Sequence, residues 1–418
     1  MRISFYIYQI SQCLFIIISV LYEKYQSSKT LGSFNIQKED IMLYKDFKDK
    51  KLSALGMGVM RLPVINGNDA EIDEAATAEM VAYAMEQGVN YYDTAWGYHN
   101  GQSEIIIGKV LAKYPRDSYY IATKFPGYDL SYMTKVEEIF EKQLEKTGME
   151  YFDFYLFHCL TEGNIDYYLD KKYGIFDYLM EQKKNGRIKH LGLSVHCSCN
   201  TLKRFLDAYG EHMEFCQVQL NYLDWSYQKA EEIVKLLNEN NIPIWVMEPL
   251  RGGKLADLAD KYKEKLSALR PEESIPAWAF RYLQSIPDVT VVLSGMSNLE
   301  QLKENIEINK TDKPLNDKEM KTLLGIVDDM VKTMSLPCTK CRYCTTYCPK
   351  EIDIPTLLEL YSEDCILGGG FLAPFRLESI PNEKRPHACV GCRKCEAVCP
   401  QQIKISEVMV DFENRMKK

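Results

Sequence analysis

Two kinds of hydrophobic pattern alternate along the chain after residue 42. Short runs rich in β-branched and aromatic residues are typical of strands, and longer stretches with apolar residues every three or four positions are typical of amphipathic helices. Several of the longer stretches end at Gly or Asn, as helices prefer. The pattern predicts eight strands, over residues 54–60, 90–95, 119–125, 152–158, 188–195, 215–221, 242–248 and 289–295.

Strands that alternate with helices predict a parallel sheet. Eight such units fit a (β/α)8 TIM barrel better than an open doubly wound sheet, which usually has fewer strands. The segment "GMGVMR" at 56–61 also lacks the third glycine of the G-x-G-x-x-G turn that opens a Rossmann fold. The expected fold class is therefore α/β, with a TIM barrel as the first large domain.

One more predicted helix, "NDKEMKTLLGIVDDMVKTM", leads out of the barrel into a cysteine-rich segment. We place the boundary between the two near residue 330. The expected organisation has three parts: a hydrophobic extension over residues 1–41, the barrel over 42–330, and a small cysteine-rich domain over 331–418.

The extension differs from the rest of the chain. It has no charge from Ile3 to Tyr22 and is just long enough to span a bilayer. The following "YEKYQSSKT" offers no small-residue cleavage site of the signal-peptide kind. We interpret residues 1–41 as a mis-assigned start or a membrane anchor, and we favour a soluble, cytoplasmic protein that begins near Met42.

Composition narrows the classes of function. With 46% hydrophobic and 26% charged residues, the 418-residue chain is ordinary for a globular protein of at least two domains. A net charge of -8 argues against a general nucleic-acid binder, because phosphate contacts need a basic surface. The fourteen cysteines are the unusual feature, since eight of them fall in two short runs. Such clustering in a large chain indicates metal binding in a reducing compartment rather than a disulfide framework.

Polar residues stand at the ends of three predicted barrel strands, where TIM-barrel active sites lie. These are Asp93, Lys124 and His158, and Tyr98 follows Asp93 in the next loop. Taken singly, the Asp could cap a helix, the Lys could pair at the surface and the His could be a satisfied core residue. Taken together, a buried charge at each of these positions would be costly unless it were paired, so the set indicates a catalytic site.

The stretches "YYDTAWGYHNGQSE", "IATKF" and "YLFH" carry these residues, and they resemble the aldo/keto reductase family over about residues 42–310. The resemblance implies an NAD(P)-dependent oxidoreductase that acts on a small carbonyl or alcohol substrate. It also implies that Tyr98 is the general acid, that Lys124 lowers its pKa, that Asp93 holds Lys124, and that His158 orients the carbonyl. The chemistry agrees, because an alkoxide that forms on hydride arrival needs a proton donor at its oxygen.

The same resemblance implies the cofactor contacts. Ser194 and Gln217 resemble the ligands of the nicotinamide carboxamide. The loop "EPLRGG" lies where a loop of the family binds the pyrophosphate of the cofactor. The resemblance therefore implies cofactor contacts for Pro249, Leu250, Arg251 and Gly253. The residues that resemble the family's ligands of the adenosine end are Gly295, Ser297, Gln301, Glu304 and Asn305.

Four positions depart from the family pattern. Val195 replaces the usual Asn, Met247 replaces the aromatic residue that stacks on nicotinamide, and Gly295 and Gln301 replace the basic residues that grip a 2'-phosphate. Without those charges we expect NADH to be at least competitive with NADPH.

The cysteine runs "CTKCRYCTTYCP" (338–349) and "CVGCRKCEAVCP" (389–400) repeat one spacing. Zinc sites also use CxxC, but four close thiolates followed by proline, twice, form the pattern of a bacterial ferredoxin with two [4Fe-4S] clusters. We therefore expect an α+β ferredoxin-like domain. In that pattern the fourth cysteine of each run belongs to the other cluster, so one set is Cys338, Cys341, Cys344 and Cys399, and the other is Cys389, Cys392, Cys395 and Cys348.

The two halves together predict an oxidoreductase with iron–sulfur electron transfer. Nicotinamide moves electrons in pairs and a cluster moves them singly, and the sequence shows no flavin motif to connect the two. A flavoprotein or other redox partner could supply that step, or the clusters could be structural or sensory. The alternatives are therefore a redox sensor or an electron-transfer protein whose barrel binds nucleotide and turns over weakly. Association with a membrane is expected only if residues 1–41 form an anchor.

Overall fold

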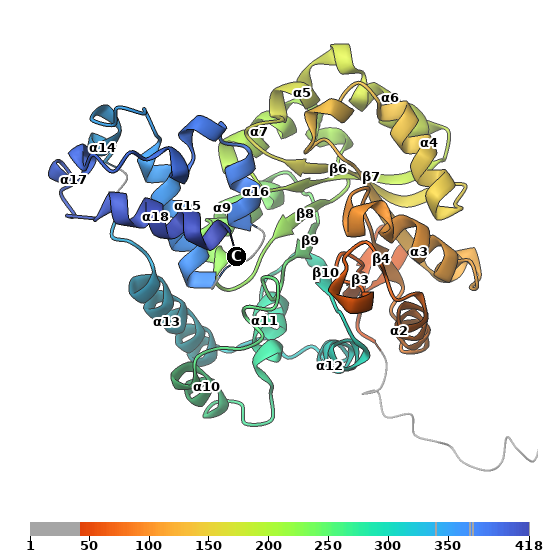
Figure 1. Ribbon diagram of the computed structural model, residues 1–418. Coiled ribbons are helices and arrows are strands. Elements are labelled where there is room, and N and C mark those ends of the chain that lie inside the picture. The colour runs from red at the N-terminus through yellow and green to blue at the C-terminus, as the bar shows by residue number, and fades with distance from the viewer. Residues whose placement is uncertain (1–41, 339–340, 368, 370–371, 418) are drawn as a thin grey trace, which may run out of the picture. The chain divides into compact units, whose positions relative to one another are not determined.

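Eight parallel strands form a closed barrel in the computed structural model (Figure 1). β10 pairs with β3 and closes the circle. The strands overlap all eight ranges that the hydrophobic pattern predicted, so the TIM barrel is confirmed. They are β3 (Leu55–Gly58), β4 (Tyr91–Asp93), β5 (Tyr120–Phe125), β6 (Phe152–Leu160), β7 (Ile188–Val195), β8 (Cys216–Gln219), β9 (Ile244–Met247) and β10 (Val289–Gly295).

The structure describes residues 42–338, 341–367, 369 and 372–417. The predicted extension over residues 1–41 lies outside this part of the chain. Within the described ranges, no helix combines the length and the apolar character needed to cross a bilayer.

Helices follow the strands and cover the outside of the barrel. The main helices are α2 (Glu74–Glu86), α3 (Ser103–Leu111), α4 (Val136–Thr147), α6 (Ile175–Lys184), α7 (Cys199–Tyr209), α9 (Ala230–Glu239), α11 (Ile275–Gln284) and α12 (Leu299–Asn309). Shorter helices in the loops are α5 (Ile165–Leu169), α8 (Asp224–Tyr227) and α10 (Asp260–Ser267). Capping residues set the ends of some of these helices. The Asp73 carboxylate accepts a hydrogen bond from the backbone N–H of Ala76 at the start of α2. Gly148 adopts a left-handed φ of 66° at the end of α4.

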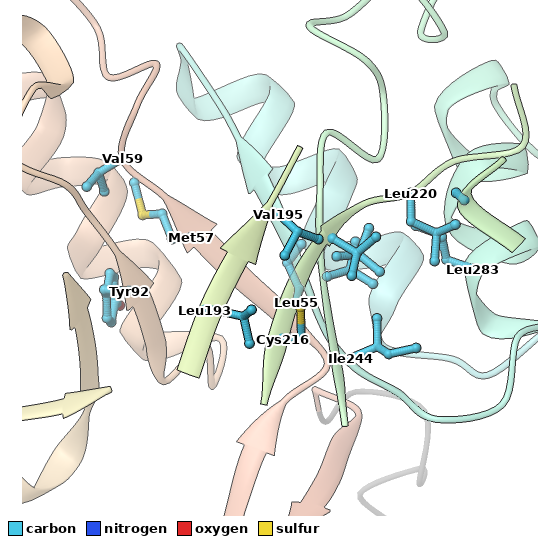
Figure 2. Packing of buried hydrophobic residues seen from close by; sticks show 14 of the residues in the cluster. Leu55, Met57, Val59, Tyr92, Leu193, Val195, Cys216, Leu220, Ile244 and Leu283 are labelled. Atoms are coloured by element: carbon cyan, nitrogen blue, oxygen red, sulfur yellow. The ribbon is translucent and has the colours of Figure 1, made fainter. Parts of the chain in front are cut away.

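The core lies between the barrel strands and these helices. Figure 2 shows part of it, with Leu193 and Ile244 on the strands and Leu283 on α11. Alternate side chains point into the barrel instead, where space is limited. A Cβ at Gly56 would lie 2.6 Å from the side chain of Leu293, so only glycine fits at this position.

A short hairpin precedes the barrel and was not predicted. Its strands are β1 (Tyr44–Phe47) and β2 (Lys50–Ser53). Phe47 packs edge-on against Trp245 with ring centroids 5.0 Å apart, and Leu52 is fully buried. The four-residue strands carry three lysines between them and show no strict alternation of apolar and polar residues, which explains why the pattern missed them.

After the barrel the chain continues into α13 (Asp317–Met334), whose Asn316 and Glu319 form a capping box. The following region has its own buried cluster, which includes Leu357, Leu358 and Phe412. Its helices are α14 (Tyr343–Thr346), α15 (Ile354–Leu367), α16 (Leu372–Glu378), α17 (Lys394–Ala397) and α18 (Ile405–Met416). Among the described residues of this region no strand is assigned, so the expected α+β character is represented only by helices.

The repeat in the sequence reappears as a repeat in structure. Cys344 and Cys395 are buried in the two short helices α14 and α17, which lie side by side (Figure 1). Each helix follows an arginine with a left-handed backbone, Arg342 at φ 64° and Arg393 at φ 59°. The two cysteine runs therefore fold into the same local turn twice.

Candidate active site

The four residues expected at the strand ends come together at one end of the barrel. Asp93 is the last residue of β4, Lys124 and His158 lie near the ends of β5 and β6, and Tyr98 begins a turn after β4. The Lys124 Nζ donates to an oxygen of Asp93 at 2.6 Å and to the Tyr98 hydroxyl at 3.3 Å. The rings of Tyr98 and His158 meet edge to face, with centroids 6.1 Å apart.

Burial dominates the electrostatics of this group. It raises the pKa of the Asp93 carboxyl and lowers the pKa of the Lys124 ammonium, while the attraction between the two opposes both changes. Burial also raises the pKa of Tyr98, and the charges of Asp93 and Glu248 add to the increase. The sequence led us to expect a pKa for Tyr98 that Lys124 lowers. In the structure the net change is upward, and the phenol keeps its proton.

His158 is held as a neutral ring. Burial lowers its pKa well below the usual value, and the positive charge of Lys124 acts in the same direction. Its Nδ1 is buried and has no hydrogen-bond partner among the described residues. The next residue, Cys159, has a left-handed φ of 57°, and its N–H donates to the Ser194 hydroxyl at 2.8 Å. That bond holds a strained backbone next to His158.

A second buried carboxylate, which we did not predict, lies behind the lysine. Glu104 is fully buried and accepts hydrogen bonds from Thr123, Gln143 and Lys146 at 2.6 to 2.7 Å. Its negative charge raises the pKa of Lys124 and so favours the charged ammonium. The sequence shows Glu104 only as a glutamate in a predicted helix shortly after Tyr98, which is typical of an ordinary surface residue. Its burial beside Lys146 is visible only in the structure.

The predicted cofactor residues differ in their surroundings. Ser194 and Gln217 are buried beside the site, and the Gln217 Oε1 has no hydrogen-bond partner among the described residues. The backbone N–H of Ser297 donates to the Gln301 side chain at 2.8 Å. Asn305 is buried, and its side-chain amide donates to the Ser294 hydroxyl at 3.0 Å. It therefore contacts strand β10 and is not exposed at the surface. The exposed members of the set are Gly253, Gly295, Ser297, Gln301 and Glu304.

The loop after β9 contains the other members. Pro249 is buried and Leu250 is half-buried. Arg251 is 3% exposed, and its guanidinium contacts two carboxylates, Asp224 and Glu363, at 3.2 and 2.6 Å. Because Glu363 belongs to α15, this residue of the predicted cofactor loop is held by the cysteine-rich region.

Arg61 lies beside Gly252 and Gly295 and was not predicted. A Cβ at Gly295 would lie 3.2 Å from Cδ of Arg61, and one at Gly252 would lie 3.1 Å from its Nη2. The guanidinium also contacts Glu248 at 3.5 Å. Arg61 follows β3 at the active-site end of the barrel, a position that could have marked it in the sequence.

The eight cysteines of the two runs line two separate cavities. One is lined by Cys348 together with Cys389, Cys392 and Cys395, and the other by Cys399 together with Cys338, Cys341 and Cys344. Burial raises the pKa of Cys344 to about 11, and the nearby thiols of its own set add to the increase. In each cavity four thiols are thus assembled from both runs.

The remaining lining of both cavities is largely apolar, with Ile403, Ile405 and Met409 among its members. Within the described ranges, no three His, Cys, Asp or Glu side chains lie close enough together to hold a single metal ion. Four thiols around an apolar cavity suit the larger [4Fe-4S] cluster. Cluster binding would require the thiols to ionise and would release their protons.

Comparison with known proteins agrees with this geometry. Residues 54–328 match the aldo/keto reductase family, and residues 337–404 match the 4Fe-4S dicluster domain. The NADH-specific methylglyoxal reductase of Escherichia coli (strain K12) is 24% identical over 315 residues, which cover 63% of this chain and 93% of that protein. The L-galactose dehydrogenase of Arabidopsis thaliana is 25% identical over 311 residues, which cover 69% and 94%.

Among solved structures, the holo form of the aldo-keto reductase AKR11C1 from Bacillus halodurans is similar, with a TM-score of 0.55 and 25% identity. The match covers 68% of this chain and 96% of that one. It leaves part of the chain uncovered, and the cysteine-rich region has its own family match after the barrel. The chain therefore belongs to the aldo/keto reductase family and carries a 4Fe-4S dicluster domain on the C-terminal side of its barrel.

Proposed function

We propose that the protein transfers hydride between a nicotinamide cofactor and a small carbonyl or alcohol substrate, and that its dicluster domain exchanges single electrons with a partner. The observation that supports the first part best is the buried contact of Lys124 with both Asp93 and Tyr98. Asp93, Lys124, Tyr98 and His158 are the proposed catalytic residues.

The proposed roles follow from where the protons lie. The Tyr98 hydroxyl keeps its proton and donates it to the carbonyl oxygen as negative charge develops there. Lys124 donates to the Tyr98 oxygen and stabilises the phenolate that is left. The neutral ring of His158 orients the same carbonyl oxygen. Asp93 keeps the lysine in place, and a reduced nicotinamide supplies the hydride when bound.

A buried polar atom without a partner at the barrel site fits a nicotinamide dinucleotide. The buried Gln217 Oε1 is an acceptor available for a carboxamide N–H. Arg61 and Arg251 bring guanidinium donors near the loop proposed for the pyrophosphate, and each also contacts a carboxylate. Gly295 and Gln301 provide no charge for a 2'-phosphate, so we propose NADH as the preferred cofactor. The specificity stated in the name of the Escherichia coli relative points the same way.

The two cysteine-lined cavities support the proposal of two [4Fe-4S] clusters, each of which carries one electron at a time when bound. Large hydrophobic side chains are exposed next to the cysteines: Tyr343 is 60% exposed, Tyr347 is 54% exposed and Val390 is 58% exposed. Exposed apolar side chains beside a redox centre are a feature of protein docking sites. We therefore propose that a redox partner binds the dicluster domain.

The experiment that tests this function measures reduction of a panel of small aldehydes, ketones and dicarbonyls by the cluster-loaded protein with NADH and with NADPH. The alcohol product and the oxidised nucleotide should form in equal amounts. Nucleotide binding without turnover on any carbonyl would overturn the catalytic proposal and leave a nucleotide-binding sensor.

A further inference from the structure

Two nitrogens of the Arg251 guanidinium, Nε and Nη1, are buried and make no hydrogen bond within the described residues. The Nε of Arg251 lies 3.2 Å from an oxygen of Asp224, and its Nη2 donates to Glu363 at 2.6 Å. Its Nη1 is buried and has no partner among the described residues. An unpaired guanidinium nitrogen at a buried position is costly, which makes it a candidate for binding an anionic ligand.

Glu363 is the residue that orients this guanidinium from the other domain. It lies on α15, is 1% exposed, and accepts hydrogen bonds from Gln228 at 2.6 Å and from Arg376 at 3.0 Å as well. Two guanidinium groups thus offset the charges of Glu363 and Asp224. A carboxylate so fully buried and paired has a single available orientation.

The loop that contains Arg251 needs such support. Arg251 has a left-handed φ of 47°, and Glu248 has one of 56°. Non-glycine residues adopt this conformation only where their surroundings hold them there. Asn221 donates to the carbonyl of Glu248 at 3.0 Å and to Asp224 at 2.7 Å, so the loop and the partners of Arg251 form one connected network.

The same helix reaches one of the cysteine-lined cavities. Pro355 and Leu358 of α15 line the cavity of Cys338, Cys341, Cys344 and Cys399. Glu363 lies five residues after Leu358, about 7.5 Å along the helix axis. A single helix therefore borders a proposed cluster site and orients a residue of the proposed cofactor loop.

We infer that Glu363 of the dicluster domain is a positioning residue for dinucleotide binding in the barrel. By holding Nη2 of Arg251, it directs the free Nη1 to a phosphate oxygen of the cofactor and keeps the loop of residues 248–253 in its binding conformation. The inference rests on the proposed function, because it takes this loop as the pyrophosphate site.

The test uses the full-length, cluster-loaded protein and the Glu363→Gln variant, with NADH binding followed by nucleotide fluorescence. We expect the dissociation constant to rise about tenfold, which is typical for the loss of one charge-assisted hydrogen bond. The matched control is Asp364→Asn. Asp364 is buried next in the same helix, but it pairs with Arg415 inside the dicluster domain. This control should bind NADH as the unaltered protein does.

A double-mutant cycle separates positioning from general damage to the fold. If Glu363 acts through Arg251, then Glu363→Gln should have little further effect on NADH binding in an Arg251→Met background. Equal affinity for NADH in the Glu363→Gln variant and the unaltered protein would overturn the inference, and so would equal effects of Glu363→Gln in both backgrounds. Failure of the unaltered protein to bind NADH and NADPH would instead overturn the proposed function.

Discussion

The ammonium of Lys124 lies 2.6 Å from the carboxylate of Asp93, and both side chains are almost completely buried. Such a pair contributes little to stability as a whole, because removing two charges from water offsets their attraction. We propose that its role lies in the chemistry of Tyr98, whose hydroxyl accepts a further hydrogen bond from the lysine besides those to Asp93 and the carbonyl of Thr94.

Removal of one partner of this pair should destabilise the barrel. Lys124→Met leaves the Asp93 carboxylate buried without a counterion, and we expect a loss of about 3–5 kcal/mol in the free energy of unfolding. Lys124→Met combined with Asp93→Asn should recover part of that loss. The four tryptophans all lie in the barrel, so their fluorescence during urea unfolding reports on this domain. Equal stability of Lys124→Met and the unaltered protein would contradict a charged pair.

The pH dependence should show a neutral His158. Burial lowers its pKa below the usual value near 6.5, so the ring takes up a proton only on the acid side of that value. We expect kcat/KM for carbonyl reduction to show no step that belongs to His158 between pH 6 and 8. A step near pH 6.5 that disappears in His158→Asn would show that the ring is protonated in this range.

The crossed arrangement of the cysteines predicts which pairs of substitutions act together. Cys348→Ala and Cys392→Ala should remove the same cluster, so the double variant should keep about four of about eight irons. Cys341→Ala combined with Cys392→Ala should remove both clusters. Iron analysis of the purified variants provides the measurement. If each run held its own cluster, Cys348→Ala with Cys392→Ala would instead lose all the iron.

A single added charge should change the cofactor preference. Gln301 is exposed at the start of α12, where an arginine could reach a 2'-phosphate. We expect Gln301→Arg to tighten NADPH binding about tenfold and to change NADH binding much less. Gln301→Met is the neutral control. Tight NADPH binding by the unaltered protein would show that other residues grip the phosphate.

The sequence predicted the parts of this fold that depend on repeated pattern. All eight barrel strands appeared as apolar runs, and the repeated CxxCxxCxxxCP spacing predicted the two sets of thiols that line the cavities. The hairpin at Phe47 was missed because its two strands carry three lysines and show no strict alternation of apolar and polar residues.

The parts that depend on tertiary contact could not be predicted. The loop sequence pointed to Arg251 as a cofactor residue, but nothing in it revealed Glu363, which lies 112 residues away along the chain. The rise in the pKa of Tyr98 comes mainly from burial, which only the folded structure defines. Glu104 gained meaning only when the fold placed Lys146 beside it.

The most direct test of the account is the Tyr98→Phe variant, measured in its cluster-loaded form. The change removes only the hydroxyl that donates the proton, so carbonyl reduction should fall about 10²- to 10⁴-fold while the dissociation constant for NADH stays the same. The iron content should also be unchanged, because the substitution lies in the barrel. Carbonyl reduction at the rate of the unaltered protein would contradict the assignment of Tyr98 and, with it, the proposed hydride-transfer site.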